Sequence, residues 1–585
     1  MRMIRRLAPH LIITIITYWI VNIIAHAIRI GLITKQSPYQ ITSNTITALQ
    51  TSLPTSLQAQ DVCISLGAIA LANLIYYAYQ VSKKTYRDKE EYGSAKWAQP
   101  QEMARYTDHD PKYNLQMTAT EGLSLDTNAT YRNLNVLMLG GSGARKTSCY
   151  VLPNIKKMNM NIAVTDPKGE IYDATHHMLE ASGEYDVHCL DLVDLTHETQ
   201  FNPLKYIDPI KPDIAIMRLV TNIIANTKSA ESAKNTDDFW VMSEKSLLTA
   251  LIAYVYYTKV GEHADQCNLV TVTQLAAKLR ASENDEDRMS EVDCMMQAAA
   301  ELYNEYVGHE TEYTPEAQRM IEGLRFAADQ YNPFTQGAGE TKKSIIISLA
   351  VRLAPLNVKQ VQDIMCADNI GIDHIGRGNK KVAIFLKLPD EDTTFNFIAA
   401  IFYQCLFENV LQRTRSMPGG RLPQPLHCYL DEFANVGKIP NFERLISTIR
   451  SRNVSASIIL QTLGQLKTMY KDGWETITGN CDNILFYGGF EKTTTEWVSA
   501  LLGKQTIDTK DTSQSKGRNG SYSINYRRTG RELMQPNELA KMDNNYCIYI
   551  LRGVNPFYSR KIDFNGHIAK PVSRLKHSKQ WKDAH

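Results

Sequence analysis

The sequence predicts an α/β nucleotide-binding domain that is interrupted by an all-α insertion and preceded by a two-helix membrane hairpin. A glycine-rich loop follows a short apolar run at residues 135–148. Two apolar stretches, Leu11–Ile33 and Val62–Val81, are long enough to cross a bilayer. Between Pro212 and His374, apolar residues recur at helix spacing and few strand patterns occur.

The loop reads Asn135-Val-Leu-Met-Leu-Gly-Gly-Ser-Gly-Ala-Arg-Lys-Thr-Ser148 and has the strand, turn and helix layout of a phosphate-binding loop. Glycines let backbone N–H groups surround a phosphate, and the following helix points its positive end at the same group. Lys146 is expected at the β- and γ-phosphates of ATP, and the Thr147 hydroxyl at Mg²⁺. The residues predicted to line the nucleotide are Gly140, Gly141, Ser142, Gly143, Ala144, Arg145, Lys146, Thr147 and Ser148.

One position departs from the pattern, because Arg145 stands where a glycine is expected before the lysine. A side chain there can crowd the phosphate or force the loop open. The position needs close backbone approach, however, so an arginine that points outward is compatible with binding. We expect ATP to bind, because Lys146, Thr147, Asp431 and Glu432 are all retained.

The first 85 residues are predicted to form the membrane anchor. A cleaved signal peptide is the alternative for the first stretch, but its apolar core is too long and no small-residue cleavage site follows. A buried helix is the alternative for the second. Basic residues flank the outer ends, and the segment between the stretches, residues 34–60, holds one lysine, which predicts that both termini are cytoplasmic. The flanking cations are Arg2, Arg5, Arg6, Lys83, Lys84 and Arg87.

Polar residues interrupt the first apolar stretch. Arg29 is expected to extend to the membrane interface. Asn22 and His26 are candidates for contacts between the two helices.

Length and composition narrow the class of protein. A chain of 585 residues exceeds what one hydrophobic core supports, which predicts two or three domains. The net charge of +2 excludes a globally basic surface, so any nucleic-acid contact must come from local patches or a ring of subunits. The ten cysteines show no CxxC pair, which is typical of reduced thiols in a core.

A second strand, Asn161–Thr165, runs into Asp166-Pro-Lys-Gly-Glu170. Polar residues at the carboxyl end of such a strand face the nucleotide crevice of an open α/β sheet. Asp166 and Lys168 are therefore candidate nucleotide-binding residues. An ordinary Pro-Gly turn is the alternative interpretation.

Further strands are predicted at Asp186–Leu192, Lys381–Leu388 and Leu426–Leu430. The third of these ends in Asp431 and Glu432. Asp431 is expected to hold Mg²⁺ through water, and Glu432 to act as the general base that activates the attacking water. Many strands end in Asp-Glu, so this assignment depends on the phosphate-binding loop upstream.

The very apolar helix Phe395–Leu411 is short and interrupted by polar residues, which favours a buried crossover helix over a third membrane span. The next strand, Val454–Leu460, ends at Gln461, whose amide is a candidate for aligning the water. Arg450 and Arg452 are candidates for arginine fingers that reach a neighbouring subunit's nucleotide. Surface arginines at a helix end are the alternative.

The remaining segments complete the domain. Strands are predicted at Asn483–Gly488 and Tyr546–Gly553, and Thr506–Arg531 is predicted to be a polar loop. The basic tail, residues 566–585, is predicted to be disordered.

Taken together, these motifs resemble those of the TraG-like coupling proteins of type IV secretion. The blocks that carry the resemblance are the membrane hairpin, Tyr92-Gly-Ser-Ala-Lys-Trp-Ala98, the phosphate-binding loop, Thr165-Asp-Pro-Lys-Gly-Glu170, Phe201-Asn-Pro203, Leu430-Asp-Glu-Phe-Ala-Asn-Val-Gly437, Ser447-Thr-Ile-Arg-Ser-Arg452 and Gln461-Thr462.

The resemblance implies a RecA-like ATPase in the bacterial inner membrane that forms a hexameric ring. It also implies that relaxase-bound single-stranded DNA is passed to a secretion channel at the expense of ATP. The implied segments are an anchor at 1–85, a nucleotide-binding domain at 86–211 and 375–565, an all-α domain at 212–374 and the tail. Two alternatives are a non-catalytic membrane receptor for the DNA-processing complex and a double-strand DNA translocase of the chromosome-segregation type.

Overall fold

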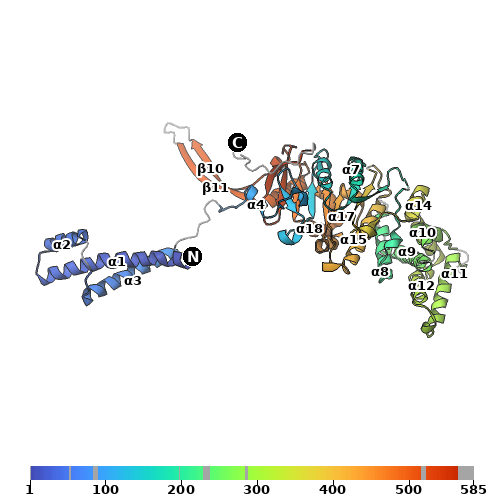
Figure 1. Ribbon diagram of the computed structural model, residues 1–585, viewed down its shortest axis with the longest axis horizontal. Coiled ribbons are helices and arrows are strands. Elements are labelled where there is room, and N and C mark those ends of the chain that lie inside the picture. Colours follow the sequence, from blue (N-terminus) through green and yellow to red (C-terminus); the bar gives the residue numbers. More distant parts are fainter. Residues whose placement is uncertain are drawn as a thin grey trace. The chain divides into compact units, whose positions relative to one another are not determined.

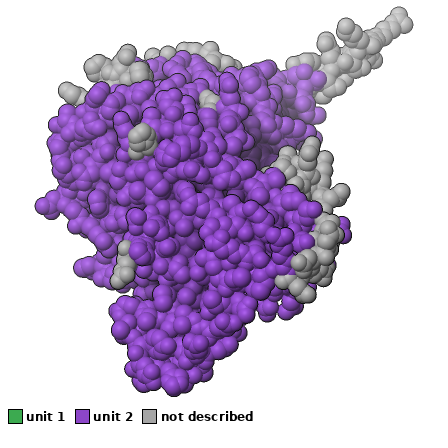
Figure 2. Space-filling model, turned by 90° about the vertical axis from the view of Figure 1, so that its right-hand side faces the viewer, with its two compact units in different colours: residues 1–91 green, residues 92–585 purple. Residues whose placement is uncertain are grey.

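The computed structural model describes residues 2–51, 55–82, 90–196, 198–227, 238–261, 263–282, 288–389, 391–514 and 522–563. They form two compact units, Met1–Glu91 and Tyr92–His585 (Figure 1). Figure 2 shows the second unit in purple. The tail predicted at residues 566–585 lies outside the described residues.

The first unit consists of α1 (Arg2–Ile33), α2 (Pro38–Gln50) and α3 (Ala59–Ser82). Within these helices, His10–Ile33 and Ala59–Tyr79 are long and apolar enough to cross a membrane. The segment between them contains α2, whose start is closed by a capping box in which Ser37 and Gln40 bond each other's backbone N–H groups.

Arg29, which was predicted to extend to the membrane interface, bonds to α3, and its position relative to the interface stays a prediction. Its Nε and Nη2 atoms donate to the carboxylate of Asp61 on α3 at 2.9–3.1 Å, and His26 Nδ1 lies 3.3 Å from the same carboxylate. Asn22 bonds to the backbone of Ser56 just before α3. An unpaired charge is costly at membrane depth, so the arginine binds the buried acid across the hairpin.

The second unit is built on a nine-stranded sheet in the order β13-β12-β9-β3-β8-β7-β4-β6-β5. The strands from β9 to β5 are parallel, and β12 is antiparallel to both of its neighbours. Every strand predicted for the sheet is present, and β13 is an additional edge strand. The bounds are β3 Val136–Leu139, β4 Asn161–Asp166, β5 Tyr185–Asp191, β6 Lys381–Lys387, β7 Leu426–Leu430, β8 Val454–Leu460, β9 Asn483–Phe486, β12 Tyr546–Leu551 and β13 Phe557–Arg560.

Both faces of this sheet are buried. Leu137 and Leu139 of β3 join one hydrophobic cluster, and Val136 and Met138 of the same strand join the other. Burial on both faces explains why the parallel strands read as continuous apolar runs. The helices that flank the sheet include α6 Leu152–Ile155, α7 Glu170–Ala181, α15 Asn396–Thr414, α16 Phe442–Ile449, α17 Leu463–Tyr470, α18 Trp474–Gly479, α19 Lys492–Leu502 and α20 Pro536–Leu539.

The described residues between 212 and 374 form helices and no strand, as predicted. They share one hydrophobic cluster with the sheet. On α8, Asn222 Nδ2 donates to Ala400 O at 3.0 Å and to Gln404 Oε1 at 2.6 Å on α15. The helices are α8 Pro212–Asn226, α9 Asp238–Lys259, α10 Leu269–Ala276, α11 Glu291–Tyr306, α12 Pro315–Thr335, α13 Gly339–Leu353 and α14 Lys359–Met365.

The prediction of a polar loop at Thr506–Arg531 is wrong. Lys504–Gln514 (β10) and Tyr522–Glu532 (β11) pair as antiparallel strands, from Lys504↔Glu532 to Gln514↔Tyr522. This ribbon has no strand in common with the nine-stranded sheet. Its sequence is polar on both faces, so it lacks the apolar–polar alternation by which a half-buried strand is found.

Candidate nucleotide site

The predicted nucleotide residues follow four neighbouring parallel strands. In the sheet, β3, β8, β7 and β4 lie side by side. The carboxyl ends of these strands lead into the phosphate-binding loop, Gln461, Asp431 with Glu432, and Asp166. Because the strands are parallel, all these residues come to one edge of the sheet, where open α/β folds bind their ligands.

The two halves of the predicted site meet. Thr147 Oγ1 donates to Asp431 Oδ2 at 2.7 Å, and Lys146 Nζ lies 3.9 Å from Glu432 Oε1. Thr147 and Asp431 are 284 residues apart in the chain, and the pairing of β3 with β8 and of β8 with β7 brings them together.

Lys146 is buried, and its Nζ donates to Gly140 O at 2.7 Å and to Gly141 O at 3.4 Å. Burial lowers the pKa of Lys146, and the carboxylates of Glu432 and Asp431 oppose that shift. The ammonium group is therefore held at the loop, next to acids that favour its charged form.

Asp431 is buried at the end of β7, and desolvation raises its pKa although Thr147 donates to it. Mg²⁺ prefers hard oxygen ligands, and this hydroxyl–carboxylate pair supplies them. Among the described residues, His, Cys, Asp and Glu side chains form no metal-binding group of three or more. Thr147 and Asp431 thus fit a Mg²⁺ ion that takes its other ligands from phosphate and water.

Glu432 and Gln461 form a second pair. Gln461 Nε2 donates to both carboxylate oxygens of Glu432, at 3.2 and 3.0 Å. Glu432 has φ 48°, a left-handed conformation that costs free energy in a non-glycine residue and is found at functional sites. This backbone turn directs the Glu432 side chain toward Gln461 and Lys146.

The remaining loop residues lie in the turn between β3 and the following helix. Gly140 must be glycine, because a Cβ there would lie 2.9 Å from Tyr487 Cβ. Ser142 and Gly143 are exposed, Ala144 is buried, and Ser148 Oγ bonds to Arg145 O. The helix predicted after the loop is a π-helical turn, Thr147–Val151, continued by α6.

Arg145 points out of the loop, as predicted for an arginine compatible with binding. Its Nη2 donates to Asn544 O at 2.8 Å and to Asn545 Oδ1 at 2.9 Å, and Asn544 Nδ2 donates back to Gly143 O at 3.3 Å. Its φ of 63° is left-handed, the conformation that a glycine would adopt without strain.

Sequence reasoning missed Lys561, which lies just after β13. Its buried Nζ donates to Ala144 O and Tyr487 O, both at 2.9 Å, and to Asn544 Oδ1 at 2.8 Å. Burial lowers its pKa to about 8. No local pattern marks this lysine, because its partners are distant in sequence and only the fold brings them together.

Arg145→Gly is expected to leave the affinity for Mg-ATP within about threefold of wild type. The side chain points out of the loop to Asn544 and Asn545, so the lost hydrogen bonds, about 1 kcal/mol each, and the relieved strain, about 1 kcal/mol, change the stability of the loop rather than its contact with nucleotide. Equilibrium binding of a fluorescent ATP analogue measures this. A loss of more than tenfold would show that the arginine contributes to the nucleotide site itself.

Asp166 is buried at the end of β4, and its Oδ2 accepts from Tyr172 N at 2.8 Å in the first turn of α7. Burial raises its pKa to about 6, nearby Asp431 adds to the shift, and backbone N–H groups oppose it. Lys168 is exposed, and its positive charge is close enough to Lys146 to lower the pKa of Lys146. Gly169, at φ 74°, makes a turn, so the motif caps α7 as well as facing the crevice.

The raised pKa of Asp166 makes stability depend on pH. The folded protein binds the proton more tightly than the unfolded chain, so the stabilisation from the neutral acid is lost as pH rises through about 6. Relative to wild type, the free energy of unfolding of Asp166→Asn is expected to rise by up to about 3 kcal/mol between pH 4 and 7. Melting temperatures of both proteins across this range measure it. A difference independent of pH would contradict the assigned pKa.

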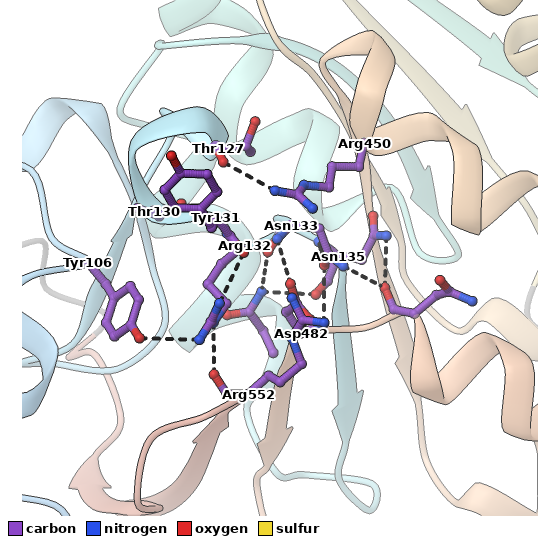
Figure 3. Close-up of polar contacts among 12 residues, drawn as sticks. Tyr106, Thr127, Thr130, Tyr131, Arg132, Asn133, Asn135, Arg450, Asp482 and Arg552 are labelled. Atoms are coloured by element: carbon purple, nitrogen blue, oxygen red, sulfur yellow. Dashed lines mark hydrogen bonds and ion pairs between the residues drawn. The ribbon is translucent and has the colours of Figure 1, made fainter.

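Arg450 and Arg452 lie away from these residues. They immediately precede β8, at the opposite edge of the sheet, about 23 Å from Gln461 for a seven-residue strand. Arg450 Nη2 donates to Thr127 O at 3.4 Å, and Arg452 Nη1 to Gly420 O at 2.7 Å. Figure 3 shows Arg450 bonded to Thr127 and Arg132 bonded to the backbone of Arg552. Within one chain, neither finger candidate reaches the nucleotide site.

The fold and the site define a RecA-like P-loop NTPase with a helical domain between its nucleotide motifs. Residues 85–576 match the family model described as Type IV secretory system Conjugative DNA transfer. The match covers most of the sequence, and the chain belongs to this family.

Relatives and solved structures agree with this assignment. Protein VirD4 of Agrobacterium fabrum is 22% identical over 82% of this chain and 67% of its own length. The coupling protein VirD4 of Bartonella henselae is 23% identical, over 74% of this chain and 63% of its own length. Among solved structures, the coupling protein TrwB with the ATP analogue ADPNP has a TM-score of 0.53 at 12% identity, covering 84% of this chain and 98% of TrwB. The chain thus spans about two thirds of the length of these VirD4 relatives and has the fold of TrwB.

Proposed function

We propose that this protein is a membrane-anchored ATPase that delivers relaxase-bound single-stranded DNA to a type IV secretion channel. The observation that carries the proposal is the 2.7 Å bond between Thr147 and Asp431, with Lys146 and Glu432 beside it. Family membership supports conjugative DNA transfer as the process. TrwB, whose fold this chain has, was solved with an ATP analogue and with ADP and Mg²⁺.

Each residue at the sheet edge has a part in hydrolysis. Thr147 and Asp431 would hold Mg²⁺, which would supply neutralisation of the phosphate charge when bound. Lys146 stabilises the charge that develops on the transferred phosphate. Glu432 accepts the proton of the attacking water, and Gln461 keeps the carboxylate of Glu432 in place. Asp166 and Lys168 border the same crevice.

A ring of identical subunits fits the positions of the arginines. In a head-to-tail ring, each contact joins two different surfaces of the chain. Arg450 and Arg452 lie at the sheet edge opposite the nucleotide site, so their role is to reach the nucleotide of the adjacent subunit. The ring we propose is a homo-hexamer in the bacterial inner membrane, with both termini in the cytoplasm and other secretion components as partners.

The test is ATP hydrolysis by the purified full-length protein in detergent, with and without single-stranded DNA. We expect hydrolysis that requires Mg²⁺ and increases with DNA, with a DNA affinity that falls steeply as salt is added. If the protein does not bind Mg-ATP at millimolar concentration, the ATPase proposal is wrong and the protein is a non-catalytic receptor. Stimulation by double-stranded DNA alone would instead favour a duplex translocase.

A further inference from the structure

The β10–β11 ribbon is a basic arm with no assigned role. Figure 1 shows its two strands standing away from the nine-stranded sheet. Residues 504–532 contain seven Lys or Arg and three Asp or Glu, whereas the whole chain has a net charge of only +2. Eleven residues per strand give the ribbon a length of about 36 Å.

Cations lie on both faces of the ribbon. Lys510 is directly opposite Tyr526, and Arg527 is opposite Thr509 on the other face. The Tyr526 side chain is 77% exposed. Tyrosine beside lysine and arginine is the combination found at membrane–water interfaces, where the ring lies at head-group level and the cations meet lipid phosphates.

The base of the ribbon is bonded to the segment that follows the membrane anchor. Ala95 N donates to Lys504 O at 2.9 Å, Tyr92 N donates to Thr506 Oγ1 at 3.0 Å, and Ser94 forms a β-bridge with Gln505. Gly93 permits this pairing, because a Cβ there would lie 2.1 Å from Lys504 O. The Tyr92–Ala98 motif noted in the sequence therefore docks the ribbon.

This connection limits how far the ribbon can be from the bilayer. In helix α3, Ala59–Tyr79 is long and apolar enough to cross a membrane, and fourteen residues lie between Tyr79 and Ser94. Such a segment spans at most about 50 Å when fully extended. A ribbon about 36 Å long, tied at its base to this segment, reaches the membrane surface whenever the segment spans less than about 36 Å, which is well short of its full extension.

From charge, exposed tyrosine and chain connection, we propose that the β10–β11 ribbon binds anionic phospholipid head groups on the side of the membrane where the ATPase lies. Lys510, Arg527 and Tyr526 are the contact residues. The inference goes beyond the proposed function and requires only that the two apolar helices span a bilayer. Nucleic acid is the competing anion, but it does not account for the attachment of the ribbon to the segment after the anchor.

The test is hydrogen exchange of residues 504–532 in full-length protein, reconstituted in nanodiscs of phosphatidylcholine alone or with phosphatidylglycerol. We expect slower exchange in the anionic discs, and loss of this protection at high salt. Lys510→Gln with Arg527→Gln should weaken the bound state about 25-fold, at about fivefold per charge. The matched control, Lys359→Gln with Lys492→Gln, removes two exposed cations elsewhere and should change nothing.

Two results would overturn the inference. Equal exchange in the two kinds of disc would show that the ribbon does not bind anionic lipid. Protection by a single-stranded oligonucleotide in neutral discs, without protection by phosphatidylglycerol, would make the ribbon a nucleic-acid arm. ATP hydrolysis by the same variants is measured in detergent as a test of the proposed ATPase activity alone. None of the substituted residues belongs to the nucleotide site, so hydrolysis should be normal even if the ribbon does not bind lipid.

Discussion

Lys146→Ala is expected to reduce ATP hydrolysis on the order of 10³-fold, because it removes a preorganised cation at the transferred phosphate. The lysine is buried, and its Nζ is held at the loop carbonyls. Conjugative transfer should fall in parallel. Phosphate release by purified protein and mating frequency of complemented cells are the two measurements.

Lys492→Ala is the matched control for this substitution, since Lys492 is an exposed cation on α19. Hydrolysis and transfer by that variant should equal wild type. If transfer continues in the Lys146→Ala variant, the chain is a non-catalytic receptor and a different ATPase drives transfer.

Glu432→Gln is expected to lower hydrolysis by about 10²- to 10⁴-fold while ATP still binds, because the amide keeps the shape of the side chain but cannot accept the proton. Thr147, Asp431 and Lys146 remain in place, so the affinity for Mg-ATP should change little. Single-turnover hydrolysis and equilibrium binding on the same preparation separate the two effects.

Glu496→Gln is the matched control for Glu432→Gln, since Glu496 is an exposed acid on α19. A variant at Glu432 that loses affinity and hydrolysis equally would show that this residue binds nucleotide rather than activating water. Gln461→Ala should have a smaller effect on hydrolysis, since Gln461 acts by holding Glu432 in place.

The strands of the sheet and the candidate nucleotide residues beside them could be selected from the sequence, because their signals are local. Buried parallel strands are continuous apolar runs, and the glycine turn before Lys146 and the Asp-Glu after β7 stand next to such runs. Arg145 was more difficult, since only the positions of Asn544 and Asn545 show where its side chain goes.

The ribbon was mispredicted for a physical reason. Both of its faces are polar, and β-branched residues such as Thr506, Ile507, Thr509 and Thr512 were its only strand signal. The ion pair of Arg29 was not predicted, because its partner, Asp61, is on another helix. Pairings between distant segments leave no trace in local periodicity.

The sequence by itself determined the parallel strands of the sheet, the two apolar stretches, the all-α character of residues 212–374 and the residue types of the phosphate-binding loop, since each depends on neighbouring residues. Only the tertiary structure decided that Thr147 and Asp431 meet, that Lys561 supports the loop, and that Arg450 and Arg452 lie at the far edge of the sheet. These outcomes depend on strand order, which is set by packing between segments hundreds of residues apart.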